Sequence, residues 1–151
     1  MKIKDIMTDT VAFVGPDTSV VETAQLMQKH DIGAMPVCEG QNIIGIVTDR
    51  DIVVRNVAHN KDPKTSTVRD VMTSQVKTVS PDTGLSQAAA LMSQGQVRRL
   101  PVVENNHLVG MVSLGDLATQ AKYDVELART LGEISSPSEP ENMQPKNFKD
   151  R

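Results

Sequence analysis

The hydrophobic positions of the chain mark two pairs of short apolar runs. Residues 35–38 and 43–47 flank one polar turn, and residues 100–103 and 107–112 flank another. Two β-branched runs around a short polar turn are typical of a β-hairpin. The pattern therefore predicts two hairpins, one in each half of the chain.

Apolar residues at helical spacing surround the first hairpin. Ser19 and Glu22 form a capping-box pattern ahead of an apolar stripe, which predicts a helix over residues 19–30. After the hairpin, residues 49–58 predict a second helix. Its expected inward residues are Ile52, Val53 and Val57.

Each half also contains a short β-type run near its start. Residues 11–14 and 76–79 predict one strand each, and residues 84–94 predict a helix before the second hairpin. The predicted order in each half is β-α-β-β-α. The expected fold class is α+β.

The two halves are copies of each other. Residues 35–51 align without a gap at an offset of 65 residues (Thr48 to Ser113). The aligned pairs include Pro36 with Pro101, Gly45 with Gly110, Thr48 with Ser113, and Asp51 with Asp116. This is an internal duplication.

The duplication divides the chain into expected units. We expect one repeat at residues 1–58, a polar linker at 59–67, a second repeat at 68–122, a helix at 123–134 and a disordered tail at 135–151. A repeat of about 50 residues is marginal alone, so the two should bury their apolar faces together.

The expected last helix carries an apolar stripe of its own. The stripe consists of Val125, Leu127, Ala128, Leu131 and Ile134. Such a stripe needs a partner. Two partners remain open, the core of the same chain or a second subunit.

Composition narrows the function classes. The net charge of −3 and the pI near 5.6 argue against a general nucleic-acid binder, which needs a basic face. The sequence has neither an apolar run long enough to cross a membrane nor an apolar signal core at its N-terminus, so we expect a cytoplasmic protein. Cys38 is the only cysteine, and its place in a predicted strand indicates a buried small side chain.

The duplicated hydroxyl and carboxylate allow two interpretations. Thr48 with Asp51, and Ser113 with Asp116, fit the capping box of a helix start. A carboxylate also accepts hydrogen bonds from vicinal hydroxyls such as those of a ribose, and the N–H groups at a helix start suit phosphate oxygens. Both interpretations stay open on these residues alone.

Two adjacent arginines favour the ligand interpretation in the second repeat. Neighbouring residues of an extended segment point to opposite faces, so Arg98 or Arg99 should turn toward an internal cleft. Burying an arginine there is costly unless it meets an anion. Gly33 and Ala34 occupy the aligned positions of the first repeat, so the two sites should differ.

These motifs resemble a tandem pair of CBS domains, a family called after cystathionine β-synthase. The signature, glycine-hydrophobic-x-Thr/Ser-x-x-Asp after a hydrophobic-Pro-Val strand, occurs twice, and the resemblance covers about residues 3–121. It implies two repeats packed around a pseudo-twofold axis. It also implies two clefts between them, which in many members bind adenosine nucleotides or related adenosyl compounds.

The resemblance assigns residues to both clefts. Asp116 is placed on the ribose diol, Ser113 near the phosphate, and the Arg98-Arg99 pair on the phosphate. The remaining expected residues of this cleft, which is favoured as the stronger, are Met111, Ile32, Gly33, Thr8, Val11 and Ala12. The mirrored, weaker cleft is expected to contain Thr48, Asp51, Ile46, Gly33, Ala34, Val97, Arg98, Thr73 and Lys77.

Other chemistry has little support in the sequence. His30, His59 and His107 lack ligand spacing, and Asp49 with Asp51 lacks further recognisable oxygen ligands for a cation. No nucleotide-phosphate loop and no nucleophile paired with a base is recognisable. Metal and catalytic residues are therefore not expected.

The leading hypothesis is a non-enzymatic regulatory module. It binds an adenine nucleotide as a regulatory ligand, needs no cofactor, and signals to a second copy of itself, as a homodimer, or to an effector protein. One alternative is a structural dimerisation module with empty clefts. A nucleotide-cleaving enzyme is a third hypothesis.

Overall fold

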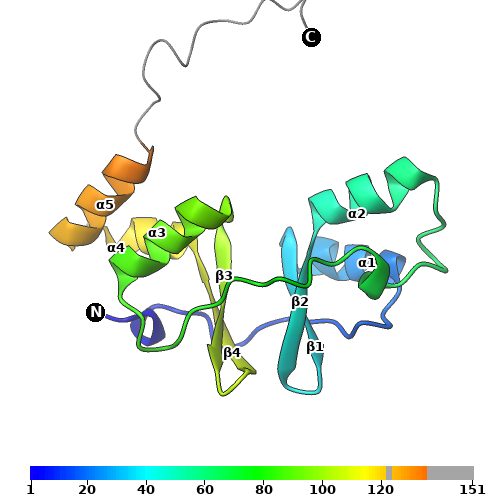
Figure 1. Cartoon of the computed structure of the whole chain (residues 1–151), viewed down its shortest axis with the longest axis horizontal. Helices are drawn as coiled ribbons and strands as arrows, with labels where there is room; N and C mark the ends of the chain where they lie inside the picture. The colour runs from blue at the N-terminus through cyan, green and yellow to red at the C-terminus, as the bar shows by residue number, and fades with distance from the viewer. Residues whose placement is uncertain (122–123, 136–151) are drawn as a thin grey trace, which may run out of the picture.

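A computed structural model describes residues 1–121 and 124–135. Its helices are α1 (Val20–His30), α2 (Asp49–Arg55), α3 (Leu85–Gly95), α4 (Leu114–Gln120) and α5 (Val125–Ser135). Its strands are β1 (Ala34–Glu39), β2 (Asn42–Thr48), β3 (Arg99–Glu104) and β4 (His107–Ser113). Three short 3-10 helices, η1 (Ile3–Asp5), η2 (Val57–His59) and η3 (Val68–Asp70), complete the elements. Figure 1 shows the two repeats side by side, each with its helices on its hairpin.

Both predicted hairpins are present. β1 pairs antiparallel with β2, and β3 pairs antiparallel with β4. Each hairpin turns through two residues, and the turn residues Gly40, Asn105 and Asn106 have φ of 60°, 53° and 63°. Glycine and asparagine tolerate this left-handed backbone better than other residues do, which explains their place in the turns.

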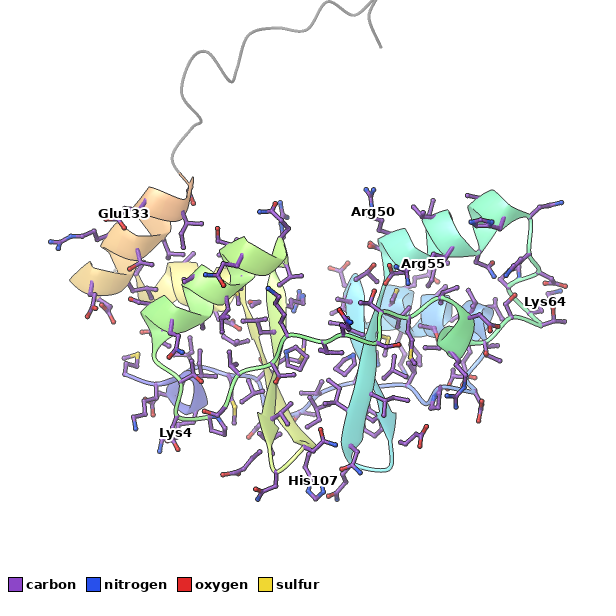
Figure 2. All side chains as sticks on the ribbon, viewed as in Figure 1. Lys4, Arg50, Arg55, Lys64, His107 and Glu133 are labelled. Carbon is purple, nitrogen blue, oxygen red and sulfur yellow. The ribbon has the colours of Figure 1, made fainter. Side chains whose placement is uncertain are left out.

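The two hairpins join at their tips. The sheet order is β1-β2-β4-β3, and the register of β2 with β4 holds one residue pair, Asn42 with His107. Two flanking backbone hydrogen bonds, Ile43 N–H to Asn106 O and Leu108 N–H to Gln41 O, support it. In residues 1–121 the central strands are thus paired only near the turns, where Figure 2 places His107.

The repeats exchange their first segments. Ile3 of η1 is fully buried in the apolar core of the second repeat, and its N–H donates to Thr83 O at 2.9 Å. Val68 of η3 is fully buried in the core of the first repeat, and its N–H donates to Thr18 O at 2.9 Å. The chain therefore crosses the seam twice, along residues 6–13 and 71–78 (Figure 1). The two repeats cannot separate without unfolding these contacts.

The predicted strands at residues 11–14 and 76–79 are wrong as strands. Each forms a single parallel bridge, Val14 to Val37 and Val79 to Val102. These segments belong to the crossing connectors, which pair with the hairpins only at isolated bridges such as Thr8 to Met111 and Thr73 to Ile46.

The inward face predicted for the second helix is largely wrong. Ile52 is buried, but Val53 and Val57 are 57% and 61% exposed. α2 ends at Arg55 after seven residues, and Ile52 is its one buried residue. Val57 falls in η2, which begins a new turn away from the core.

The apolar stripe of α5 packs on its own chain. Leu127 is fully buried in the core of the second repeat, Leu131 packs against that core, and Ile134 at the far end is 37% exposed. The chain's own core therefore contacts the Leu127 and Leu131 part of the stripe. Of the tail expected at residues 135–151, Ser135 is the last residue of α5, and residues 136–151 lie outside the described residues.

Cys38 is buried, as the sequence indicated. Its residue is 4% exposed, and burial raises the pKa of its thiol. A thiol held protonated is a poor nucleophile.

The glycines of the duplicated motif allow a crossing connector to lie on each hairpin. A Cβ on Gly110 would lie 2.7 Å from Met7 Sδ and 2.9 Å from Thr8 O. A Cβ on Gly45 would lie 2.7 Å from Met72 Sδ and 3.0 Å from Thr73 O. Only glycine permits this approach without a shift of the connector.

Gly110→Ala is expected to lower the free energy of unfolding by about 1–3 kcal/mol, because a new methyl group forces a backbone carbonyl to move. Urea unfolding measures the change. Gly132→Ala in α5 is the control, because among residues 1–121 and 124–135, apart from its chain neighbours and the backbone of its own helix, no atom lies within 4 Å of the added Cβ. That change is expected to raise stability by about 1 kcal/mol. Equal stability of Gly110→Ala and the unaltered protein would contradict the close approach.

Candidate functional site

Both strand-to-helix junctions are complete capping boxes. Asp51 Oδ2 accepts from Thr48 N–H at 3.0 Å, and Thr48 Oγ1 accepts from Asp51 N–H at 3.1 Å. The Ser113 and Asp116 junction repeats this with distances of 2.9 and 3.1 Å. The capping interpretation is thus confirmed, and each cap uses only Oδ2 of its carboxylate. Within residues 1–121 and 124–135, Oδ1 of neither aspartate has a hydrogen-bond partner, which leaves an acceptor for a ligand.

The first-turn N–H groups of α2 are already engaged. Asp49 N–H donates to Gly33 O at 2.9 Å, and Arg50 N–H donates to Asp49 Oδ1 at 2.8 Å. Asp51 N–H is held by the cap. The expectation that this helix start offers free N–H groups to an anion is therefore wrong. An anion here has to be held by side chains.

The Ser113 cleft, a cavity of about 230 Å³, lies where the first connector crosses the seam. Asp116 and Arg99 are its charged groups, and the rest of its wall is apolar or carries hydroxyls. The lining residues are Thr8, Thr10, Val11, Ala12, Ile32, Ala34, Pro36, Arg99, Met111, Ser113 and Asp116.

The Thr48 cleft, a cavity of about 280 Å³, is its pseudo-twofold mate at the second connector. Its charged groups are Asp51, Lys77 and Arg99. The lining residues are Ile46, Thr48, Asp51, Thr73, Gln75, Val76, Lys77, Gly95, Val97, Arg99 and Pro101.

A larger central cavity of about 750 Å³ lies between the clefts. It brings together Arg50, Arg98 and Arg99 with one carboxylate, Asp49. The other lining residues are Gly33, Ala34, Ile46, Thr48, Gln96 and Val97. Figure 2 shows Arg50 at the end of α2 nearer the second repeat.

Most residues expected for the Ser113 cleft lie in it, and two do not. Arg98 and Gly33 line the central cavity instead. Arg98 precedes β3, and its carbonyl accepts from Leu114 N–H at 2.7 Å at the start of α4. Thr10, Ala34 and Pro36 are lining residues that the sequence reasoning missed.

The Thr48 cleft departs from expectation in its basic groups. Gly33, Ala34 and Arg98 do not line it, whereas Arg99 does. The other missed lining residues are Gln75, Val76, Gly95 and Pro101. Applying the offset of 65 residues to the first cleft predicts three of them, since Thr10, Val11 and Pro36 align with Gln75, Val76 and Pro101.

The cations of these cavities are free to meet a ligand. Within the described part of the chain, the side chains of Lys77, Arg98 and Arg99 form no ion pair or hydrogen bond. The same holds for the guanidinium of Arg50. Arg99 is half-buried and lines all three cavities. A half-buried arginine without an acid partner favours an anionic ligand.

Among residues 1–121 and 124–135, no group of three or more His, Cys, Asp or Glu side chains is placed to hold a metal ion. No helix in that part of the chain has the length and hydrophobicity of a membrane span.

Comparison with known proteins places the chain in a family. The family model described as CBS domain matches residues 3–56 and 68–122. The CBS domain-containing protein YhcV of Bacillus subtilis (strain 168) is 42% identical over 133 residues, which cover 88% of this chain and 94% of YhcV. The chain belongs to the CBS domain family, as a tandem pair of repeats.

Two solved structures similar to this chain contain ligands. The CBS domain pair of MJ0100, in complex with 5′-methylthioadenosine and S-adenosyl-L-methionine, has a TM-score of 0.73 at 27% identity and covers 81% of this chain and 96% of its own. CBSX2 in complex with AMP has a TM-score of 0.71 at 27% identity, over 80% of this chain and 96% of its own.

Proposed function

We propose that this protein is a regulatory module that binds an adenosine nucleotide at the seam between its repeats. One observation carries the proposal. Each cleft combines a capped aspartate, which keeps one free oxygen for a ribose diol, with a hydroxyl and at least one unpaired cation. This donor and acceptor set matches a nucleotide.

The complexes of related proteins support this ligand class. MJ0100 holds adenosyl compounds without a phosphate, and CBSX2 holds AMP. The apolar residues around each aspartate offer a wall for a purine. We therefore assign the adenosyl group to both clefts, with Asp51 and Asp116 as the ribose acceptors.

The crossing connectors give occupancy a route to the rest of the molecule. Thr8 and Met111 exchange backbone hydrogen bonds of 2.9 Å, and Ile46 and Thr73 do the same at 3.0 and 2.9 Å. All four residues line a cleft. A ligand that binds one packing of the repeats better than another shifts their equilibrium, which a partner chain or a second copy can read.

Thermal unfolding with saturating AMP, ADP, ATP or adenosine tests the proposal. A ligand at about a hundred times its dissociation constant adds roughly 2.7 kcal/mol to the free energy of unfolding. Inorganic phosphate and cytidine are the controls, and they are expected to give a smaller shift. Unchanged unfolding with every adenosyl compound would contradict the proposal. Recovery of ATP intact after incubation tests the absence of catalysis.

A structural dimerisation module is the second candidate. The capping boxes are complete without any ligand, and α2 with η2 exposes Val53, Val54 and Val57. In this case sedimentation would show a dimer that Val53→Ser and Val57→Ser dissociate. Adenosine and its nucleotides would leave unfolding unchanged.

A further inference from the structure

The pseudo-twofold symmetry of the two clefts is broken at the positions that carry positive charge. Arg99 aligns with Ala34, and Lys77 aligns with Ala12. Arg99 lines both clefts, and its aligned residue Ala34 supplies no second arginine. Lys77 lines the Thr48 cleft, and its counterpart in the Ser113 cleft is the uncharged Ala12.

These two positions give the clefts different charge. Lys77 and Arg99 face the single carboxylate of Asp51 in the Thr48 cleft, a net of one positive charge. In the Ser113 cleft Arg99 alone faces Asp116, a net of zero. If an anion on the Thr48 side engages Arg99, the Ser113 cleft is left with the charge of Asp116 only. The negative charge of Asp116 then repels a second anion from the Ser113 cleft.

The central cavity extends the Thr48 cleft in particular. The two share Ile46, Thr48, Val97 and Arg99, whereas the Ser113 cleft shares only Ala34 and Arg99 with it. The cavity adds the guanidinium groups of Arg50 and Arg98. Its one acid, Asp49, already accepts a hydrogen bond from Arg50 N–H at 2.8 Å. A phosphate chain leaving the Thr48 cleft thus meets a cavity rich in arginine.

We propose that the Thr48 cleft with the central cavity is the site for a nucleoside di- or triphosphate, and that Arg99 allows only one such anion per chain. The Ser113 cleft then accepts an adenosyl compound without phosphate. The sequence predicts the Ser113 cleft to be the stronger site, whereas this proposal assigns the phosphate-bearing ligand to the Thr48 cleft. The proposal rests on the proposed function, since it assumes that both clefts accept adenosine.

Titration calorimetry with adenosine and with ATP tests it. The unaltered protein is expected to bind two adenosines but one ATP per chain. Lys77→Ala is expected to weaken ATP at least about tenfold, since a hydrogen bond to a charged group is lost, and to leave adenosine unchanged. Lys64→Ala is the matched control, because Lys64 is exposed at the far end of the first repeat (Figure 2) and lines none of the three cavities.

A symmetry graft gives the sharper test. Ala34→Arg places a second arginine at the position that mirrors Arg99 and is expected to raise the ATP stoichiometry from one to two. Ala12→Lys is the second variant. It places a lysine at the position that mirrors Lys77 and is likewise expected to raise the ATP stoichiometry from one to two. Two equal ATP sites in the unaltered protein, or unchanged ATP affinity in Lys77→Ala, would overturn this proposal while leaving the proposed function intact. Failure of both adenosine and ATP to bind would remove the proposed function itself.

Discussion

Alanine at Asp51 or Asp116 is expected to weaken adenosine binding in the altered cleft by about 10- to 100-fold, since a hydrogen bond to a charged group contributes about 1.5–3 kcal/mol. The free Oδ1 of each carboxylate is the proposed acceptor for the ribose hydroxyls. The double variant is expected to lose both sites. Calorimetry with adenosine isolates this contact, because adenosine has no phosphate to engage the arginines.

The same change also removes a helix cap, which a control has to separate from ligand contact. Asp70→Ala serves this purpose. Asp70 Oδ2 accepts from Thr67 N–H at 3.2 Å in the capping box of η3, and Asp70 lines neither cleft. Each cap is expected to contribute about 1 kcal/mol to folding. The three variants are compared by their adenosine affinity. If Asp51→Ala and Asp116→Ala lower it no more than Asp70→Ala does, the role of Asp51 and Asp116 as ribose acceptors is contradicted.

Leu127→Ala is expected to lower the free energy of unfolding by about 2–5 kcal/mol, as for other fully buried leucines. Leu127 fixes α5 onto the core of the second repeat, beside Leu85 and Leu117. Urea unfolding measures the loss. Because the contact lies within one chain, the loss should not depend on protein concentration.

Ile134→Ala is the matched control on the same helix. Ile134 is 37% exposed, so its truncation is expected to change stability by about 0.5 kcal/mol or less. A Leu127→Ala protein that keeps its stability but dissociates from an oligomer would show that the stripe contacts a second subunit instead.

Local pattern was sufficient for the hairpins and most helices. Hydrophobic spacing and turn residues placed β1 to β4 and α1 close to their observed bounds, because each is stabilised by contacts near in sequence. The side chain of Ser19 accepts from Glu22 N–H at 3.1 Å, as a capping pattern predicts. The duplication also showed that two equivalent junctions exist.

Long-range packing explains what the sequence did not show. The exchange of η1 and η3 between the repeats depends on contacts such as Ile3 with Thr83, far apart in the chain. Residues 11–14 have a β-type pattern but cross the seam, so only Val14 reaches a strand. Pattern alone cannot separate a strand from a connector that crosses a seam.

The sequence predicted most residues that line the two clefts. It did not predict how the arginines divide between the clefts and the central cavity. Alternation along an extended segment predicts that Arg98 and Arg99 point apart. Both line the central cavity, but of the two only Arg99 also lines the two clefts. Which space each faces depends on the packing of α2 and α4 around the seam. Arg50 was missed because its role depends on the central cavity, which only the folded pair creates.

A crystal structure of the protein grown with adenosine and ATP tests the central claim most directly. The account predicts ribose hydroxyls within hydrogen-bond distance of Asp51 and Asp116 carboxylates, with phosphates beside Lys77 and Arg99. Ligand bound outside the seam, or both carboxylates unoccupied at saturating ligand, would contradict it.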